Sequence, residues 1–256
     1  MAPLLDPITI AIILGAAAAG FVQGLSGFAF AMVSSAIWVW VLPPQLSSPL
    51  VVFGSLVGQI LAIPATRKGF SARRAAPLVV GGLLGVPIGV AILPHVEPAW
   101  FKAGLGLLLV VYCPAMLFST RLPHLKISGP AGDGAVGFLG GVLGGIGGIT
   151  GVLPTLWCTL NGWDKVTQRS VLQAFNLTMH ATTLTLYLVA GRITWTSASM
   201  FPIVLPAMLV PTLIGLRLYA RISEMAFRRV VLGLLFLTGI ALLVAAAPVL
   251  VGKLGG

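Results

Sequence analysis

The sequence predicts an all-α polytopic membrane protein made of two inverted repeats, each a glycine-rich broken or re-entrant helical hairpin followed by three transmembrane helices. The first observation behind this fold class is composition, because 58% of the 256 residues are hydrophobic and only 8% are charged. Soluble domains carry about 25% charged residues, so this chain cannot cover a water-facing surface. The other two observations are a repeated glycine-rich pattern and an uneven distribution of basic residues.

Apolar runs long enough to span the roughly 30 Å hydrocarbon core of a bilayer recur along the whole chain. The segments between them are too short to form a soluble domain. We therefore expect one integrated membrane domain, with the first repeat at 1–126 and the second at 127–256. The runs lie near Ile8–Val41, Pro49–Pro64, Pro77–Pro94, Trp100–Phe118, Ala135–Leu160, Val171–Ala190, Ala198–Tyr219 and Val230–Val251.

Two glycine-rich stretches resemble each other at a long interval. The first begins GFVQGLSGFAFAMV and the second begins GFLGGVLGGIGGITGVLP. A weak but ordered similarity of this kind is typical of internally duplicated transporters. The matching landmarks are Gly20 with Gly137, Gly24 with Gly141, and Gly27 with Gly144.

The length of the first apolar run predicts a fold-back inside the membrane. As one straight helix, Ile8–Val41 would be about 50 Å long, which is too long for a single crossing. Split in two, each leg would be about 25 Å long and would reach into the bilayer without comfortably crossing it. We expect both glycine-rich runs to form re-entrant hairpins, with ten short crossings as the alternative.

The basic residues predict the same topology. The formal net charge of +10 would suggest a nucleic-acid partner in a soluble protein, but here the basic residues lie in short loops, as the positive-inside rule predicts for a membrane protein. If each apolar run crosses once, eight basic residues lie on the cytoplasmic side and seven lie outside. If the glycine-rich runs fold back, twelve lie on the cytoplasmic side and only Lys102, Arg192 and Lys253 lie outside. This topology places both termini on the outer side of the inner membrane, and we expect no nucleic-acid partner.

The hairpin tips are the predicted anion-binding elements. Each half would have an odd number of crossings and would be inverted relative to the other, an arrangement that places the substrate site between the halves near the midplane. A tip also frees N–H groups at the start of its second leg, where the helix carries partial positive charge. The expected site residues are Gln23, Gly24, Ser26, Gly27 and Phe28 in the first half, and Gly147, Gly148, Thr150 and Gly151 in the second.

Glycines at GxxxG spacing have a second interpretation, because such spacing marks close packing of membrane helices. Gly137, Gly141 and Gly145 follow it. We assign these earlier glycines to packing and Gly147–Gly151 to binding.

Polar side chains add to the predicted site. Gln173, Asn176 and His180 follow one another at i, i+3 and i+7 and therefore share one helix face, which we expect to face Gln59 in the first half. Arg169 lies near the start of the same helix. It is either a positive-inside anchor or part of an electropositive vestibule for anions.

The acidic residues and the motif content exclude several functions. All five carboxylates map to loops or to the ends of apolar runs, so neither a carboxylate proton relay nor a cation site is expected. The sequence has no HExxH, GxSxG, P-loop or Cys/His metal spacing, so we expect no enzyme activity, metal or cofactor. If protons are coupled to transport, His180 or the substrate itself is the titrating group.

The stretches GFVQGLSGFAFAMV, followed by VLPPQLSSPLVV, and GFLGGVLGGIGGITGVLPTLWCTLNGWDKVTQRSVLQAF resemble the two repeats of the sulfite/sulfonate exporter family (TauE/SafE). The resemblance covers nearly the whole chain. It implies a polytopic inner-membrane transporter of sulfite, sulfonates or other small anions, generally outward. In the family's second repeat a proline usually follows Gly-Gly almost directly, whereas GGITGVLP delays Pro154 and would alter the tip.

We therefore expect a secondary carrier that exports a small anion through the lipid bilayer. Three alternatives remain open from the sequence: an importer or broader organic-anion carrier, a passive channel, and an intramembrane enzyme that uses His180.

The topology can be tested by placing single cysteines at Lys165 and Arg192 in a variant without the native cysteines. We expect an impermeant thiol reagent to modify the cysteine at 165 only from the cytoplasmic side and that at 192 only from outside. Labelling of position 165 from outside would contradict the hairpin topology.

Overall fold

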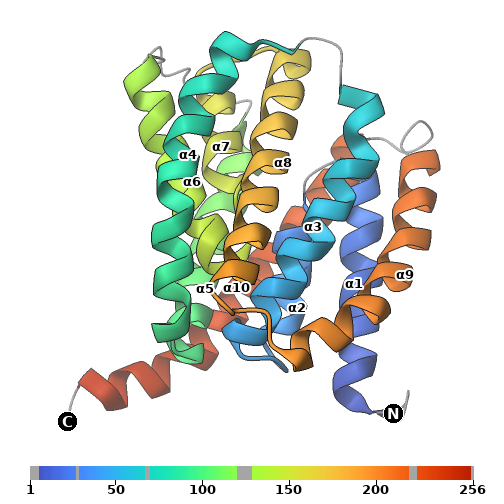
Figure 1. Cartoon of the computed structure of the whole chain (residues 1–256), viewed down its shortest axis with the longest axis vertical. Coiled ribbons are helices and arrows are strands. Elements are labelled where there is room, and N and C mark those ends of the chain that lie inside the picture. The colour runs from blue at the N-terminus through green and yellow to red at the C-terminus, as the bar shows by residue number, and fades with distance from the viewer. Residues whose placement is uncertain (1–5, 27–28, 67–69, 120–128, 219–223, 255–256) are drawn as a thin grey trace.

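The computed structural model describes residues 6–26, 29–66, 70–119, 129–218 and 224–254, and every regular element within them is helical (Figure 1). This confirms the predicted all-α class. The elements in chain order are α1 (Pro7–Ser26), α2 (Phe30–Trp38), α3 (Pro44–Thr66), α4 (Ala72–Ile92), the short 3₁₀ helix η1 (Leu93–His95), α5 (Pro98–Leu117), α6 (Pro130–Gly147), α7 (Val152–Leu160), α8 (Lys165–Val189), α9 (Trp195–Leu218) and α10 (Glu224–Leu254).

Six helices of the described chain are long and apolar enough to cross a membrane: α1, α3, α4 together with η1, α5, α9 and α10. This confirms a multi-pass membrane protein. Two of the apolar runs expected from the sequence do not yield such a helix, because α6 is rich in glycine and α8 carries polar side chains along its buried face. Helices α2 and α7, with nine residues each, are too short to cross.

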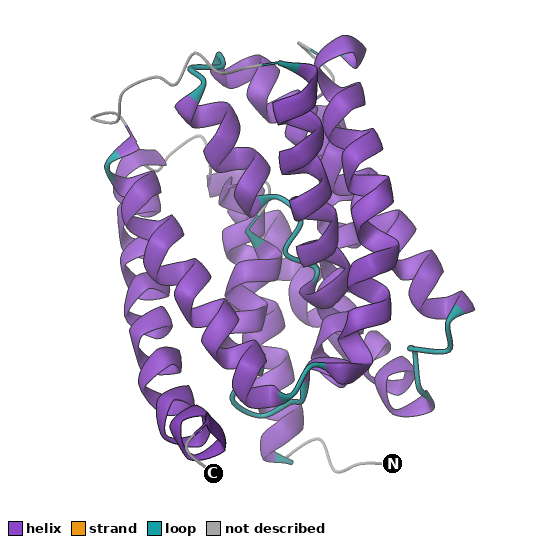
Figure 2. Ribbon diagram, turned by 90° about the vertical axis from the view of Figure 1, so that its left-hand side faces the viewer, coloured by secondary structure: helices purple, strands orange, loops and turns teal. Residues whose placement is uncertain are grey.

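Both glycine-rich runs form antiparallel hairpins. In the first hairpin the indole Nε1 of Trp38, at the end of α2, donates to the carbonyl of Ala11 in α1 at 3.3 Å. In the second, Trp157 near the end of α7 donates to Asp133 in the first turn of α6 at 2.8 Å. A tryptophan therefore joins the two legs of each hairpin at its open end. Figure 2 shows a loop midway along the bundle, where the chain passes from α6 to α7.

Contacts between the start of α4 and the start of α8 agree with these fold-backs. The Arg74 side chain lies 4.0 Å from Asp164 and over the ring of Trp163, so the start of α4 and the start of α8 lie at one end of the bundle. A single crossing by each apolar run would place them at opposite ends. The start of α1 and the end of α10 both lie at the other end of the bundle, at opposite corners of it (Figure 1). The inverted relation between the halves and the boundary at residue 126 stay predictions.

The two closest helix seams both join one half of the chain to the other, as does the looser packing of α5 on α10. Helix α4 packs on α6, and α1 packs on α9. At the α4–α6 seam, a Cβ on Gly85 would overlap the carbonyl of Phe138, and a Cβ on Gly141 would overlap that of Gly82. Glycine is required there because the two backbones touch. The packing role expected for Gly137, Gly141 and Gly145 follows from these contacts.

We expect Gly141→Ala to lower the free energy of unfolding in detergent by about 1–3 kcal/mol, because the added methyl meets backbone that cannot move aside. Gly104→Ala is the matched control, since a Cβ there meets nothing within 4 Å. It should be neutral or stabilising by up to about 1 kcal/mol through helix propensity. Equal effects of the two substitutions on chemical or thermal unfolding would contradict a packing role for this seam.

Candidate functional site

The first hairpin tip is capped by a side chain from its own first leg. Gln23 is 2% exposed, and its Oε1 accepts the N–H of Phe30, the first residue of α2, at 3.0 Å. Gly58 of α3 leaves the room for this side chain, because a Cβ there would lie 2.8 Å from Gln23. The hydroxyl of Ser26 donates to the carbonyl of Val22 one turn earlier. The predicted site residues Gly27 and Phe28 lie outside the described residues.

The second hairpin tip depends on a left-handed glycine. Gly148 has φ of +71° and donates its N–H to the carbonyl of Gly144, which ends α6. Helix α7 then starts after Gly151, three residues further on. Pro154 falls in the first turn of α7, where no intrahelical acceptor faces the missing N–H, so the delayed proline costs no hydrogen bond.

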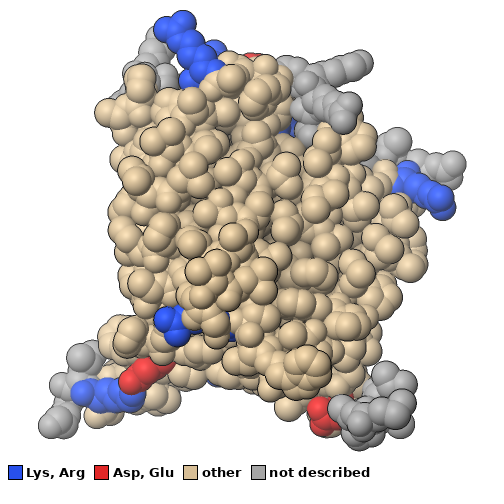
Figure 3. Space-filling model, viewed as in Figure 1, with Lys and Arg blue, Asp and Glu red and all other residues tan. Residues whose placement is uncertain are grey.

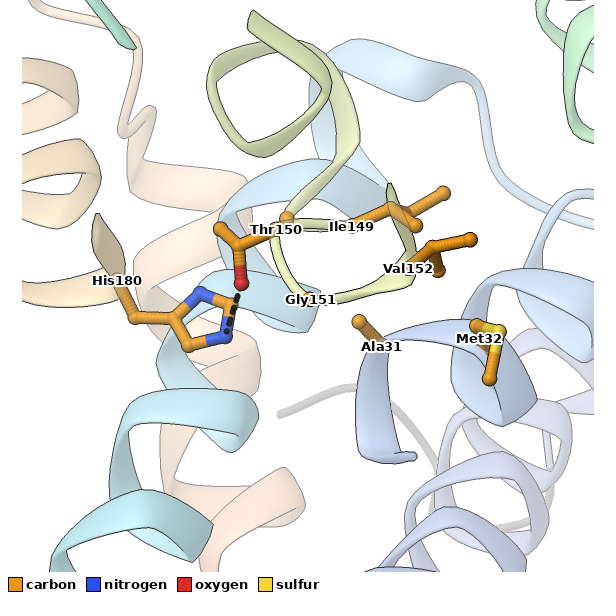
Figure 4. Close-up of a pocket in the computed structure, with 8 residues that line it drawn as sticks. Ala31, Met32, Ile149, Thr150, Gly151, Val152 and His180 are labelled. Atoms are coloured by element: carbon orange, nitrogen blue, oxygen red, sulfur yellow. Dashed lines mark hydrogen bonds between the residues drawn. The ribbon is translucent and has the colours of Figure 1, made fainter. Parts of the chain in front are cut away.

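The starts of α2 and α7 converge on one small cavity. Ala31 and Met32 line it from the first turn of α2, and the segment 148–152 lines it from the second tip and the start of α7 (Figure 4). The cavity volume is about 10 Å³, the space of about one water molecule. N–H groups in the first turn of a helix lack intrahelical acceptors, and helix dipoles make these ends partially positive. The cavity therefore lies between two helix N-termini, and its lining has no Lys or Arg.

A buried polar network forms the wall of this cavity on the α8 side. The hydroxyl of Thr150 donates to Asn176 Oδ1 at 2.8 Å and lies 3.4 Å from His180 Nε2. With its proton given to Asn176, the Thr150 oxygen can accept a hydrogen bond from His180 Nε2 in the tautomer that carries the proton there. The opposite ring atom, Nδ1, is buried without a hydrogen-bond partner. Gly151 packs directly on Asn176, since a Cβ on Gly151 would lie 2.8 Å from Oδ1.

The predicted facing of α3 and α8 is borne out. Gln173 Nε2 donates to the backbone carbonyl of Gln59 at 2.6 Å, and both side chains are buried. Gln59 Oε1 and the hydroxyl of Ser55, one turn away on α3, are buried without hydrogen-bond partners. The α3–α8 contact thus carries unsatisfied polar atoms on the α3 side as well as His180 on the α8 side.

Two predicted tip glycines have packing contacts instead. Gly24 lies inside α1 and contacts α9, where a Cβ would overlap the carbonyl of Thr212. Gly147 is the last residue of α6, and a Cβ there would lie 3.1 Å from the ring of Phe101. Neither glycine lines the cavity between the tips.

Arg169 lies in the second turn of α8, at the end of the bundle that Arg74 shares, and is half-buried. The start of α8 is fixed by Asp164, whose carboxylate accepts the N–H of Thr167 at 2.9 Å. This hydrogen bond holds the pKa of Asp164 below its ordinary value, so the cap stays charged. Asp164 therefore remains a fixed negative charge beside Arg74 at this end of the bundle.

Sequence reasoning missed the contribution of α2. Ala31 and Met32 line the cavity from the first turn of α2, where backbone N–H groups lack intrahelical acceptors, and no side-chain pattern marks such positions. The signal that could have found them is positional, since they follow the first glycine tip at the start of its second leg. Asp133 was placed at the end of a run, but its bond to Trp157 was not foreseen.

Gly148→Ala should cost more stability than Gly191→Ala, because the two positions share a left-handed φ but differ in space. A left-handed alanine costs about 1–2 kcal/mol at either site. At position 148 the new Cβ would also lie 2.8 Å from Val51 Cγ1, whereas at 191 it meets nothing within 4 Å. Unfolding measurements in detergent compare the two, and an equal loss would show that the second tip is not tightly packed.

Comparison with known proteins gave one family match. The family model described as "Sulfite exporter TauE/SafE" matches residues 12–242, which is nearly the whole chain and includes both hairpins. No significant match to a curated protein or to a solved structure was found. The match and the multi-pass helical fold agree, and the chain belongs to the TauE/SafE sulfite exporter family.

Proposed function

We propose that this protein is a secondary carrier that exports a small oxyanion, sulfite or a sulfonate, across the inner membrane, and that the anion binds between the two hairpin tips. The observation that carries the proposal is the convergence of the α2 and α7 N-termini on one buried cavity. Family membership supports transport of this substrate class. Transporters with broken helices bind anionic groups at such half-helix N-termini.

The hydrogen-bond donors expected at the cavity suit reversible binding of an anion, which a carrier requires, better than permanent binding. Binding comes from backbone N–H groups and from Thr150 and His180, and the cavity lining holds no Lys or Arg that would trap the anion. Helix N-termini contribute partial charges of about +0.5 each, enough to offset a single negative charge without excess. Gln23 and Gln59 support this site from α1 and α3, and Gln173 and Asn176 support it from α8.

The volume of the cavity implies movement of the tips. A space for about one water molecule does not hold an anion with three oxygen atoms. The tips must separate for the anion to enter, and the hairpins, each joined by its own tryptophan bond, can move apart as units. Opening toward one side at a time would give alternating access around a fixed site.

Export follows from the electrical field. An inside-negative membrane potential favours exit of an anion by about 2.3 kcal/mol per charge per 100 mV, so outward transport needs no coupled ion. Arg169, together with the other cations at its end of the bundle, would gather anions on the cytoplasmic side. If a proton accompanies the anion, His180 Nδ1 is the atom that accepts it, since it is buried beside the cavity without a partner.

Flux of radiolabelled sulfite and of a small sulfonate into or out of proteoliposomes, at imposed potentials and pH gradients, tests this function. We expect saturable flux that rises with a potential driving the anion outward. Thr150→Val should reduce it at least about tenfold, because the hydroxyl would turn from Asn176 to the bound anion, and a hydrogen bond to a charged group contributes about 1.5–3 kcal/mol. Thr178→Val is the matched control, since that hydroxyl only donates to the carbonyl of Ala174 on its own helix.

The same experiment separates the alternatives. Saturable inward flux at a potential that opposes it would indicate an importer, and flux that never saturates would indicate a channel. Chemical conversion of the labelled anion would indicate an enzyme. Absence of any saturable, potential-sensitive flux of sulfite and sulfonates would contradict the proposal, as would equal loss in the Thr150 and Thr178 variants.

A further inference from the structure

A second cavity lies at the opposite end of the bundle from Arg74, between the start of α5 and the end of α10. Its volume is about 320 Å³, far larger than that of the cavity between the tips. Glu97, Lys102 and Lys253 supply charged groups, whereas Ala245, Ala246 and Val249 form an apolar wall on α10. In Figure 1 the last turns of α10 run outward from the bundle at this corner, and Figure 3 shows basic and acidic atoms adjacent there beside an uncharged surface.

The charges at this cavity are the exceptions to the positive-inside pattern. Under the hairpin topology only three basic residues lie outside, and two of them, Lys102 and Lys253, line this one cavity. Lys253 forms a salt bridge with Glu97. Lys102 instead lies over the ring of Trp40, with its Nζ 5.3 Å from the ring centroid. With one carboxylate and two ammonium groups in the described lining, the cavity has a net charge of +1.

The depth of the cavity is that of the membrane interface. Trp40 and Trp100 lie at this end with about half of their surfaces exposed, as tryptophans do at the level of lipid headgroups. Val249, on the apolar α10 wall, is itself about half exposed, so the wall opens outward from the cavity. A ligand in this cavity therefore meets ammonium groups at headgroup level and a hydrocarbon surface beside them.

We propose that this cavity binds the headgroup of an anionic phospholipid, with the phosphate on Lys102 and Lys253 and an acyl chain along the α10 wall. The net charge matches one phosphodiester. A zwitterionic lipid fits less well, because its cation would need Glu97, which Lys253 already occupies. A free oxyanion would gain nothing from the apolar wall. The site is independent of the proposed transport function and contains none of the residues assigned to it.

Lipid binding to the purified full-length protein in detergent tests the proposal. Native mass spectrometry would measure the affinity for phosphatidylglycerol and for phosphatidylcholine of the same chain length. We expect phosphatidylglycerol to bind more tightly, and Lys102→Gln to weaken it about fivefold, since a lysine at a lipid surface contributes about that factor. Lys165→Gln, the same exchange at an exposed lysine at the other end of the bundle, should leave the affinity unchanged.

Glu97→Gln provides a test in the opposite direction. Removing the carboxylate frees Lys253 for the phosphate, so the affinity for phosphatidylglycerol should rise. If the salt bridge only joined α5 to α10, the substitution would lower the thermal stability and would not raise this affinity. Equal binding of the two lipids, an equal loss in the Lys102 and Lys165 variants, or a fall in affinity in the Glu97 variant would overturn the proposal. Full displacement of phosphatidylglycerol by millimolar inorganic phosphate would also overturn it, because that result indicates a site for free anions.

Discussion

The structure depends on one constraint: backbone N–H and C=O groups inside a bilayer have no water to bond. An unbroken helix satisfies these groups within itself, except at its two ends. Breaking two helices in the middle of the bundle frees further N–H and C=O groups, and these need hydrogen-bond partners at each break. Gln23 accepts one freed N–H at the first break, and the turn at Gly148 satisfies the end of α6 at the second. The first turns of α2 and α7 line a common cavity, and the anion proposed to bind there would supply acceptors for N–H groups that have none within their own helices.

Close helix contact brings these breaks together. The glycine seams hold α1 against α9 and α4 against α6 at backbone distance, which leaves room for the short legs α2 and α7 to meet inside the bundle. Helix α8 completes the arrangement with Asn176 and His180 beside the second tip. The polar face of α8 explains both its lower hydropathy and its central position, since polar side chains at membrane depth are tolerated where protein surrounds them.

Much of this arrangement could be predicted from the sequence. Run length and charge distribution indicated the two fold-backs, and side-chain spacing indicated the polar face of α8 and its contact with Gln59. Spacing could not separate Gly24 from Gly151, because both follow GxxxG-like patterns. Only the folded neighbours show that Gly24 contacts the α9 backbone, whereas Gly151 lies between Asn176 and the cavity. The contribution of Ala31 and Met32 was also invisible, because it comes from backbone groups that any residue type would present.

The seams also bear on how such a chain could have arisen. If the predicted repeat pairs α1–α5 with α6–α10, the α1–α9 contact corresponds to the α6–α4 contact, and the two seams are equivalent. Neither half can make it internally, since each supplies one helix to each seam. A half-length ancestor would therefore have left its glycine grooves empty as a monomer and filled both by pairing with a second copy. Gene fusion of such a dimer would have changed its connectivity while leaving its contacts in place.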